Sequence, residues 1–176
     1  MTVGFVKVPQ FLWSSTPLLK ELDLSYNPVR TVQRDHLVGL WRLQTLTLQP
    51  LPVLETIDGD ALQPLTYLTR LAVQTWPGPT LAQLVHGLRG LRHLDVDVRG
   101  TILSPGQFRD VAGLDGAPKL RHLDVSGAQL RVVQADAFAH AAIGNLPECS
   151  LAIRVRLSFV FFMVLDSPLV VSGVSR

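Results

Sequence analysis

The stretch Leu19-Lys20-Glu21-Leu22-Asp23-Leu24-Ser25-Tyr26-Asn27 decides the fold that this sequence predicts. Its pattern is L-x-x-L-x-L-x-x-N, and its centre alternates leucine with polar residues, which is typical of a short strand with one buried face. Asn27 suits a position where the backbone turns, because its amide can hydrogen-bond backbone groups of the turn and of a neighbouring coil. One such unit cannot bury its own leucines, so the pattern predicts stacked copies.

Copies of the pattern recur along the chain. They begin at Leu19, Leu43, Leu68, Leu91 and Leu120, and a sixth can be threaded through Leu146, Cys149 and Leu151. Successive starts lie 24, 25, 23, 29 and 26 residues apart, which fits a solenoid repeat of 20–29 residues. The windows Leu91–Val96 and Leu120–Val125 are identical, which is hard to obtain without repetition. We therefore expect one interior column made of Leu22, Leu46, Leu71, Leu94 and Leu123.

The segments between the copies predict short helices or coils on the opposite side. Leu37 and Leu40 fit a short helical or 3₁₀ turn, and Thr80–Leu91 and Gln107–Leu114 carry apolar residues at helical spacing. We expect a degenerate repeat or cap over 1–17, about six repeats over 18–154, and a non-repeat hydrophobic tail over 155–176. The apolar run of this tail has nine residues, too short for the roughly 20 that span a bilayer. A cover for the open core, a lipid-anchor signal and an artefact of the gene model remain alternatives for it.

Composition and charge limit the function classes. The chain has 16 basic and 14 acidic residues that are scattered along the sequence, which gives no case for nucleic acid. Cys149 is the only cysteine, so an internal disulfide and a cysteine zinc cluster are excluded. Residues 1–10 lack the apolar segment of a signal peptide. These features favour an intracellular chain or an internal piece of a longer array.

The units starting at Leu19, Leu43 and Leu120 resemble leucine-rich repeats of the typical class of about 24 residues. The stretches Leu22–Asn27, Leu46–Leu48 and Ile57–Leu62 are similar to chaoptin-like proteins of arthropods. The resemblance implies an α/β solenoid with a parallel sheet on its concave face and short helices or coils on its convex face. It further implies a membrane-anchored cell-surface adhesion protein. Against the repeat pattern, only Asn27 fills the ninth position, where the other copies carry Leu51, Trp76, Arg99 and Ala128.

The outward residues of the strands are the candidate partner-binding site on the concave face. They are Glu21, Asp23, Thr45, Thr47, Arg70, Gln74, His93, Asp95, His122 and Asp124. The alternative is that these residues only keep the array soluble. Trp76 and Trp41 are candidates for exposed anchors, although Trp41 precedes a strand, which favours the core.

No catalytic constellation is apparent. Cys149 falls at a core leucine position, and no G-x-S-x-G, phosphate-binding loop or H-E-x-x-H motif is present. His93, Asp95, His122 and Asp124 could in principle bind zinc, but ordinary surface residues explain them as well. The sequence therefore favours a non-catalytic module, without cofactor or metal, that binds a protein partner in cell adhesion. The alternative is an intracellular scaffold or adaptor. We also expect self-association through uncapped ends, and membrane attachment only in a full-length protein.

Overall fold

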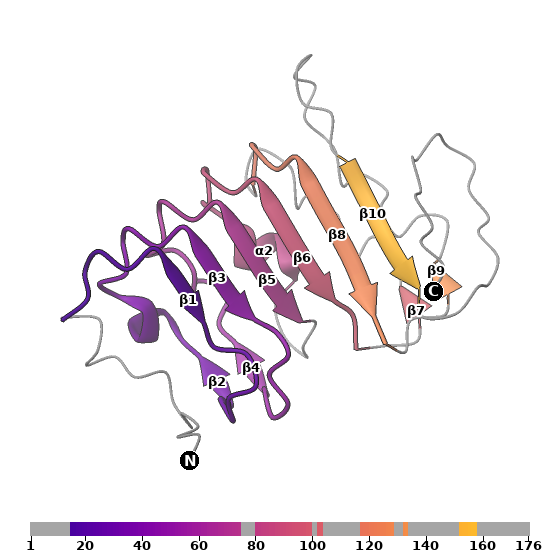
Figure 1. Ribbon diagram of the computed structural model, residues 1–176, viewed down its shortest axis with the longest axis horizontal. Helices are drawn as coiled ribbons and strands as arrows, with labels where there is room; N and C mark the ends of the chain where they lie inside the picture. The colour runs from indigo at the N-terminus through magenta and orange to yellow at the C-terminus, as the bar shows by residue number, and fades with distance from the viewer. Residues whose placement is uncertain are drawn as a thin grey trace.

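A computed structural model describes residues 15–74, 80–99, 102–103, 117–128, 132–133 and 152–157 (Figure 1). Six parallel strands form its main sheet, in the order β1-β3-β5-β6-β8-β10. Their bounds are Glu21–Asp23, Thr45–Leu48, Arg70–Gln74, His93–Asp97, His122–Gly127 and Ala152–Leu157. After β1 and after β3, a described coil returns behind the sheet to the start of the next strand (Figure 1). The chain is therefore a leucine-rich-repeat solenoid, as the spacing of the leucines predicts.

The strand register confirms the interior column. Leu22 pairs with Leu46, Leu46 with Leu71, Leu71 with Leu94, and Leu94 with Leu123. All of them are fully buried except Leu22, which lies in the first strand and is half-buried. The column forms because the residues alternate in direction along each strand and the strands are aligned without a shift.

The sixth strand does not use the residues that the sequence suggested. Ile153 pairs with Leu123 and Val155 with Val125, so Cys149 and Leu151 do not occupy the core positions of β10. Cys149 lies outside the described residues. The alternation of Ile153 and Val155 with arginines provides the strand periodicity, and the residue paired with Leu123 comes four positions later in the sequence than the pattern at Leu146 implied, at Ile153 in place of Cys149. Residues 1–14, Trp76, Gln107–Leu114 and the tail beyond Leu157 also lie outside the description.

The back of the solenoid holds small elements. β2 (Thr31–Val32) pairs with β4 (Thr56–Ile57), and β7 (Ile102–Leu103) pairs with β9 (Val132–Val133). A 3₁₀ turn, η1, covers Arg34–Leu37 and confirms the expected short turn. The expected helix in Thr80–Leu91 is much shorter, because α2 covers only Leu81–Val85.

Local residues explain where α2 begins and ends. Thr80 caps its start by accepting a hydrogen bond from the Gln83 N–H, and the Gln83 side chain accepts one from the Thr80 N–H. The chain leaves the helix at Gly87, whose φ of +81° favours glycine. The Leu88 N–H then donates to the Val85 carbonyl, which closes a turn toward the next strand.

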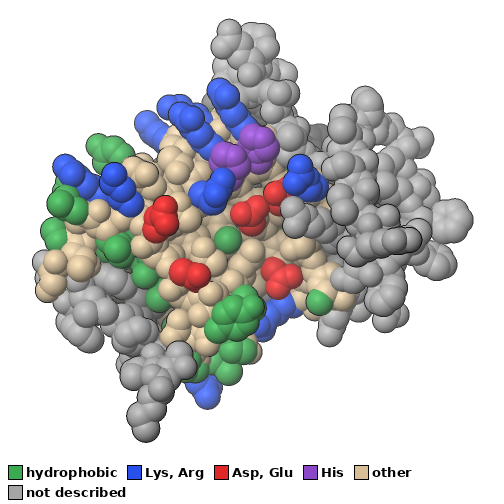
Figure 2. Space-filling view, viewed as in Figure 1, with side chains coloured by type: hydrophobic (Ala, Val, Ile, Leu, Met, Phe, Trp, Pro, Cys, Tyr) green, Lys and Arg blue, Asp and Glu red, His purple; other side chains and the backbone are tan. Residues whose placement is uncertain are grey.

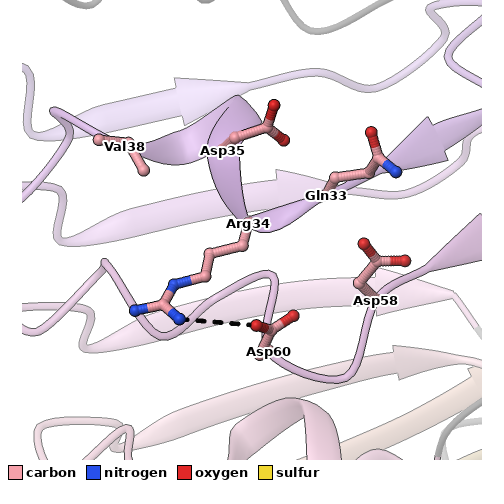
Figure 3. Close-up of a pocket in the computed structure, with 6 residues that line it drawn as sticks. All are labelled: Gln33, Arg34, Asp35, Val38, Asp58 and Asp60. Carbon is pink, nitrogen blue, oxygen red and sulfur yellow. Dashed lines mark ion pairs between the residues drawn. The ribbon is translucent and has the colours of Figure 1, made fainter.

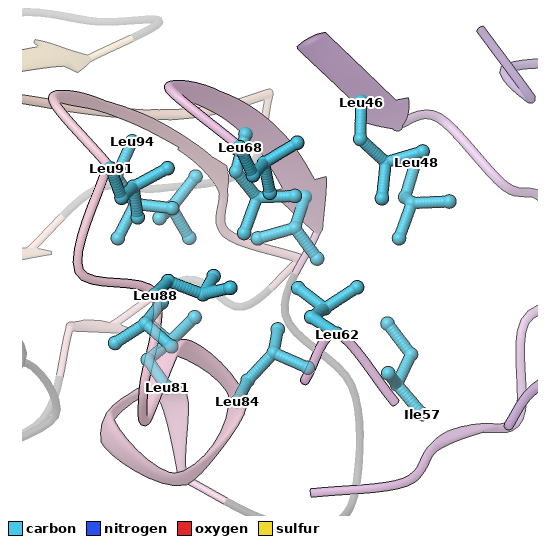
Figure 4. Close-up of a cluster of buried hydrophobic side chains, with 14 of the residues drawn as sticks. Leu46, Leu48, Ile57, Leu62, Leu68, Leu81, Leu84, Leu88, Leu91 and Leu94 are labelled. Atoms are coloured by element: carbon cyan, nitrogen blue, oxygen red, sulfur yellow. The ribbon is translucent and has the colours of Figure 1, made fainter. Parts of the chain in front are cut away.

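The core lies between the main sheet and the back elements (Figure 4). Leu46 and Leu94 enter it from the sheet, Leu84 enters it from α2, and Leu62 and Leu88 enter it from the coils behind. Each is at most 1% exposed, so each contributes on the order of 1.5–3 kcal/mol to burial of apolar surface. This core holds the strands rigidly side by side and thereby fixes the spacing of the side chains on the outer face of the sheet.

A repeated turn leads into the first five strands of the sheet. In each turn the first residue's carbonyl accepts a hydrogen bond of 3.0–3.1 Å from the fourth residue's N–H. The turns are Thr16–Leu19, Leu40–Leu43, Leu65–Leu68, Leu88–Leu91 and Ala117–Leu120. The residue after each turn continues the hydrogen-bond ladder of the sheet, because its backbone N–H donates to the backbone carbonyl of the equivalent residue in the preceding repeat. These bonds of 2.7–2.9 Å run from Gln44 to Lys20, from Thr69 to Gln44, from Arg92 to Thr69 and from Arg121 to Arg92. We call residues 16–20, 40–44, 65–69, 88–92 and 117–121 the turn edge.

Candidate interaction surface

The main sheet has an outer face that the described coils do not cover, and we call it the open face. Two rows of side chains cross its strands. One row is Glu21, Thr45, Arg70, His93 and His122, and the next is Asp23, Thr47, Ala72, Asp95, Asp124 and Arg154. The rows form because residues two apart on a strand point to the same side and the register is unshifted. Nine of the ten residues expected to bind a partner lie here, each exposed or half-exposed.

Gln74 is the exception, and its assignment to the exposed row is wrong. Its side chain is fully buried at the end of β5. The amide Nε2 donates to the Leu51 carbonyl at 2.7 Å, and Oε1 accepts from the Leu51 N–H at 2.9 Å. Gln74 therefore satisfies both backbone groups of one residue in the preceding repeat, and it is not available to a partner.

The partner of Gln74, Leu51, stands where the first repeat has Asn27. In the first repeat, Asn27 donates to the carbonyls of Leu24 and Ser25 in its own turn. Leu51 has no polar side chain for such bonds, and its own backbone N–H and carbonyl are bonded by the glutamine of the next repeat. Arg99 also donates to the Leu51 carbonyl at 2.7 Å. The sequence did carry a signal for this network, because Leu51 and Arg99 stand at the ninth position of their repeats, where the pattern has an asparagine.

Two histidines stack on the open face. The rings of His93 and His122 have centroids 4.5 Å apart and are almost parallel, with an interplanar angle of 3°. Paired positions on adjacent strands place them together, which confirms the expected separation of one strand. Partial burial and then the neighbouring His122 lower the pKa of His93 below its ordinary value, and Arg70 acts in the same direction.

Two carboxyl groups form a second pair beside the histidines. Asp95 and Asp124 are register partners, so their side chains stand side by side on adjacent strands. Burial first and the Asp124 charge second raise the pKa of Asp95, while Arg70 partly offsets the rise. Arg154 lies 3.8 Å from the Asp124 carboxylate on the next strand. Further along β6, burial raises the pKa of Asp97 and Arg99 opposes that rise.

The arrangement gives no support to a zinc site. Among the described residues, no three or more histidine, cysteine, aspartate or glutamate side chains are grouped so as to hold a metal ion. The two imidazoles lie face to face, whereas metal ligands need ring nitrogens that converge on one point. What the cluster can do is offer hydrogen-bond donors and acceptors in a flat array.

A pocket of about 450 Å³ lies away from the open face (Figure 3). It is formed by η1 and by the turn after β4, and Gln33, Arg34, Asp35, Val38, Asp58 and Asp60 line it. Arg34 and Asp60 approach to 3.7 Å across it. Its described lining contains no histidine, cysteine or serine, so these six residues offer no nucleophile paired with a neutral base.

Trp41 was expected in the core, and that expectation is wrong. Its side chain is 43% exposed because it is the second residue of the turn before β3. The Trp41 ring meets Tyr67 edge-to-face with centroids 6.4 Å apart, and the Arg42 guanidinium lies 4.6 Å from the Trp41 ring centre. Trp41 is thus an exposed aromatic residue at the turn edge.

The basic residues are scattered in the sequence but not in space. Lys20, Arg42, Arg89, Arg92, Lys119 and Arg121 all lie on the turn edge and are exposed. Figure 2 shows lysine and arginine side chains gathered along the side where the strands begin, next to the two histidines. The repeat period brings these residues to one edge, although more than 20 residues can separate successive members in the chain.

Comparisons with known proteins bear on the fold alone. No protein-family model matches the chain, and no curated protein matches it. The solved structures that are similar to it include an internalin C2 from Listeria monocytogenes str. 4b F2365, with 19% sequence identity and a TM-score of 0.48. The match covers 76% of this chain and 52% of the internalin chain, so this chain spans about half the length of that structure. No comparison adds support for a chaoptin-like identity.

No helix in the described part of the chain has the length and apolar character needed to cross a bilayer.

Proposed function

We propose that the chain is a non-catalytic module that binds a protein partner through the open face of its sheet. The observation that carries the proposal is the cluster of His93, His122, Asp95 and Asp124 on that face. Folding shifts the pKa of Asp95 upward and that of His93 downward. The charged forms of both groups are therefore disfavoured by folding, so they cost stability at pH values where they are charged. Such groups on an uncovered surface are better explained by recognition than by stability.

The extent of the surface supports a macromolecular partner. The two rows present residues of six strands at a spacing of about 4.8 Å, which suits an extended protein surface rather than a small molecule. Arg70 and Arg154 stand at either side of the cluster, so the face offers both charge signs. This mixture favours a partner with complementary polar groups.

We further infer a role in cell adhesion for a longer protein of the chaoptin-like kind, which rests on the resemblance of Leu22–Asn27, Leu46–Leu48 and Ile57–Leu62. Membrane attachment of that protein and self-association of the solenoid through its ends are part of the same proposal. An intracellular scaffold is the alternative, and the single cysteine favours it because it excludes an internal disulfide framework.

An adhesion assay tests the proposal. Beads coated with the chain are mixed with cells, and bound beads are counted for the native chain and for the double variant His122→Ser, Asp124→Ser. We expect the variant to lower binding at least about fivefold, because the substitutions remove half of the histidine and aspartate cluster. The matched control is Arg34→Ser, Asp60→Ser, which alters a charged pair of the pocket behind the sheet and should leave binding unchanged. Equal binding by all three proteins would contradict the proposed face.

Surface biotinylation of cells that make the full-length protein distinguishes the cell-adhesion role from the intracellular-scaffold role. Labelling of the protein on intact cells supports adhesion. Labelling only after lysis removes the adhesion role and supports the intracellular scaffold.

A further inference from the structure

The turn edge concentrates positive charge. Its 25 residues contain six lysines and arginines and no aspartate or glutamate, although the whole chain has 14 acidic residues. None of the ion pairs in the described part of the chain involves these six cations. Neighbouring turns are about 4.8 Å apart, which is less than the Debye length of about 8 Å at physiological salt. The six charges therefore act together on an approaching anion.

The same edge carries exposed apolar side chains. Leu18 is 62% exposed, Trp41 43% and Tyr67 60%. They lie in the first, second and third turns, so the sheet register places them in consecutive repeats. The contact between Trp41 and Tyr67 joins two of these turns into one aromatic surface. Aromatic residues that are held in place and half-exposed are frequent anchors in protein interfaces.

The two kinds of side chain divide the edge along its length. The first three turns carry the apolar residues together with Lys20 and Arg42, while the fourth and fifth carry Arg89, Arg92, Lys119 and Arg121. Along the strands, the neighbouring row adds Glu21 at the apolar end and Arg70, His93 and His122 toward the basic end. The turn edge therefore changes in character along the solenoid, from an end with exposed apolar residues to a basic end.

We propose that the turn edge docks an acidic peptide segment of a protein partner, with aromatic or aliphatic residues on the first three turns and carboxylates on the last two. The five turns span about 19 Å at a strand spacing of about 4.8 Å. An extended peptide covers that length with about six residues at roughly 3.3 Å each. Arginine guanidinium groups can bind carboxylates with two hydrogen bonds, which gives direction to the contact.

The division of the edge favours a peptide over other polyanions. A sulfated polysaccharide presents negative charge along its whole length and has no aliphatic or aromatic side chains for Leu18, Trp41 and Tyr67. An anionic membrane would need apolar and basic side chains along the whole edge, whereas the exposed side chains of the fourth and fifth turns are all arginine or lysine. A peptide with an apolar half and an acidic half matches both parts.

This inference deepens the proposed function and rests on it, because it assumes a protein partner. It concerns a different surface, however, since the turn edge borders the open face and contains none of the nine predicted residues that lie there.

Direct binding of synthetic peptides tests the inference. Two fluorescein-labelled peptides of about ten residues each combine a Leu/Phe half with an Asp/Glu half, in opposite order, so that either chain direction is represented. Fluorescence anisotropy with the full chain measures binding, and a peptide with lysine in place of the acidic residues is the charge control. We expect one acidic peptide to bind and the lysine peptide to bind at least about tenfold more weakly.

Variants assign the contact to the two halves of the edge. Arg92→Glu with Arg121→Glu should weaken binding at least about tenfold, and Trp41→Ser should weaken it about fivefold. The matched controls are Arg34→Glu for charge and Val53→Ser for an exposed apolar residue elsewhere. Circular dichroism of each variant shows whether it folds, and all of these side chains are exposed.

The outcomes separate the competing explanations. The inference would be overturned if heparin or phosphatidylserine vesicles bind as tightly as the peptides and Trp41→Ser has no effect. That result would show that the edge binds any polyanion through charge alone. Absence of peptide binding would also overturn the inference. In either case, a loss of bead adhesion by His122→Ser, Asp124→Ser would leave the proposed function standing, because that assay depends on the open face.

Discussion

Replacing Gln74 by methionine should destabilise the fold without creating a cavity. Methionine has nearly the length and volume of glutamine, so it removes only the two hydrogen bonds to the Leu51 backbone. The exposed Gln63 offers the same chemical change at a site where no buried hydrogen bond is lost, and Gln63→Met is the matched control.

The expected cost follows from which backbone group stays bonded. The Leu51 carbonyl keeps the Arg99 guanidinium at 2.7 Å, whereas the Leu51 N–H has no other acceptor among the described residues. A buried donor left without a partner costs about 1–3 kcal/mol. We therefore expect Gln74→Met to lower the free energy of unfolding by about 2 kcal/mol, and Gln63→Met to change it by less than about 0.5 kcal/mol.

Urea denaturation followed by circular dichroism measures the difference. With a slope of about 2 kcal/mol per molar urea, the loss would move the midpoint by about 1 M. The slope of the free energy of unfolding against urea concentration should stay the same if the variant exposes the same surface area on unfolding. A midpoint shift for Gln74→Met no larger than that for Gln63→Met would refute the reasoning that this amide is needed to satisfy the buried Leu51 N–H.

Three further predictions concern the open face and the core. Burial and Asp124 raise the pKa of Asp95 in the folded state. At pH values between the ordinary and the raised pKa, the folded state therefore binds more protons than the unfolded state, and the free energy of unfolding falls as the pH rises through that window. Asp95→Asn should then be more stable than the native chain at pH 7, by less than about 1 kcal/mol because the group is half-exposed. Near pH 3 it should bring no gain, and urea midpoints at the two pH values check both expectations. In an NMR titration, the pKa of His93 should lie below its ordinary value and should move only partly back in His122→Asn, because burial is the larger cause; an unchanged pKa would contradict the stacked pair. Leu71→Ala should cost about 3 kcal/mol in the centre of the column, and Leu22→Ala should cost clearly less at its half-buried end, as urea midpoints would show.

The amino-acid sequence by itself determined the repeat and its strands. The leucines at the first, fourth and sixth positions can be buried only when copies stack, so their spacing predicts the sheet, the column from Leu22 to Leu123 and nine of the ten residues on the open face. These are consequences of local alternation within about six residues, which can be read from one segment at a time.

Only the tertiary structure decided how distant repeats meet. The burial of Gln74 depends on the backbone of Leu51 in the preceding coil, and the exposure of Trp41 depends on a turn that precedes its strand. The position of the sixth strand depends on its register with β8, which places Ile153 beside Leu123. The collection of scattered cations on the turn edge has the same origin, since side chains one repeat apart become neighbours only when the hydrogen-bonded register is set. Local periodicity predicts which way a side chain points, but the contacts it makes are determined by the coil stacked against it.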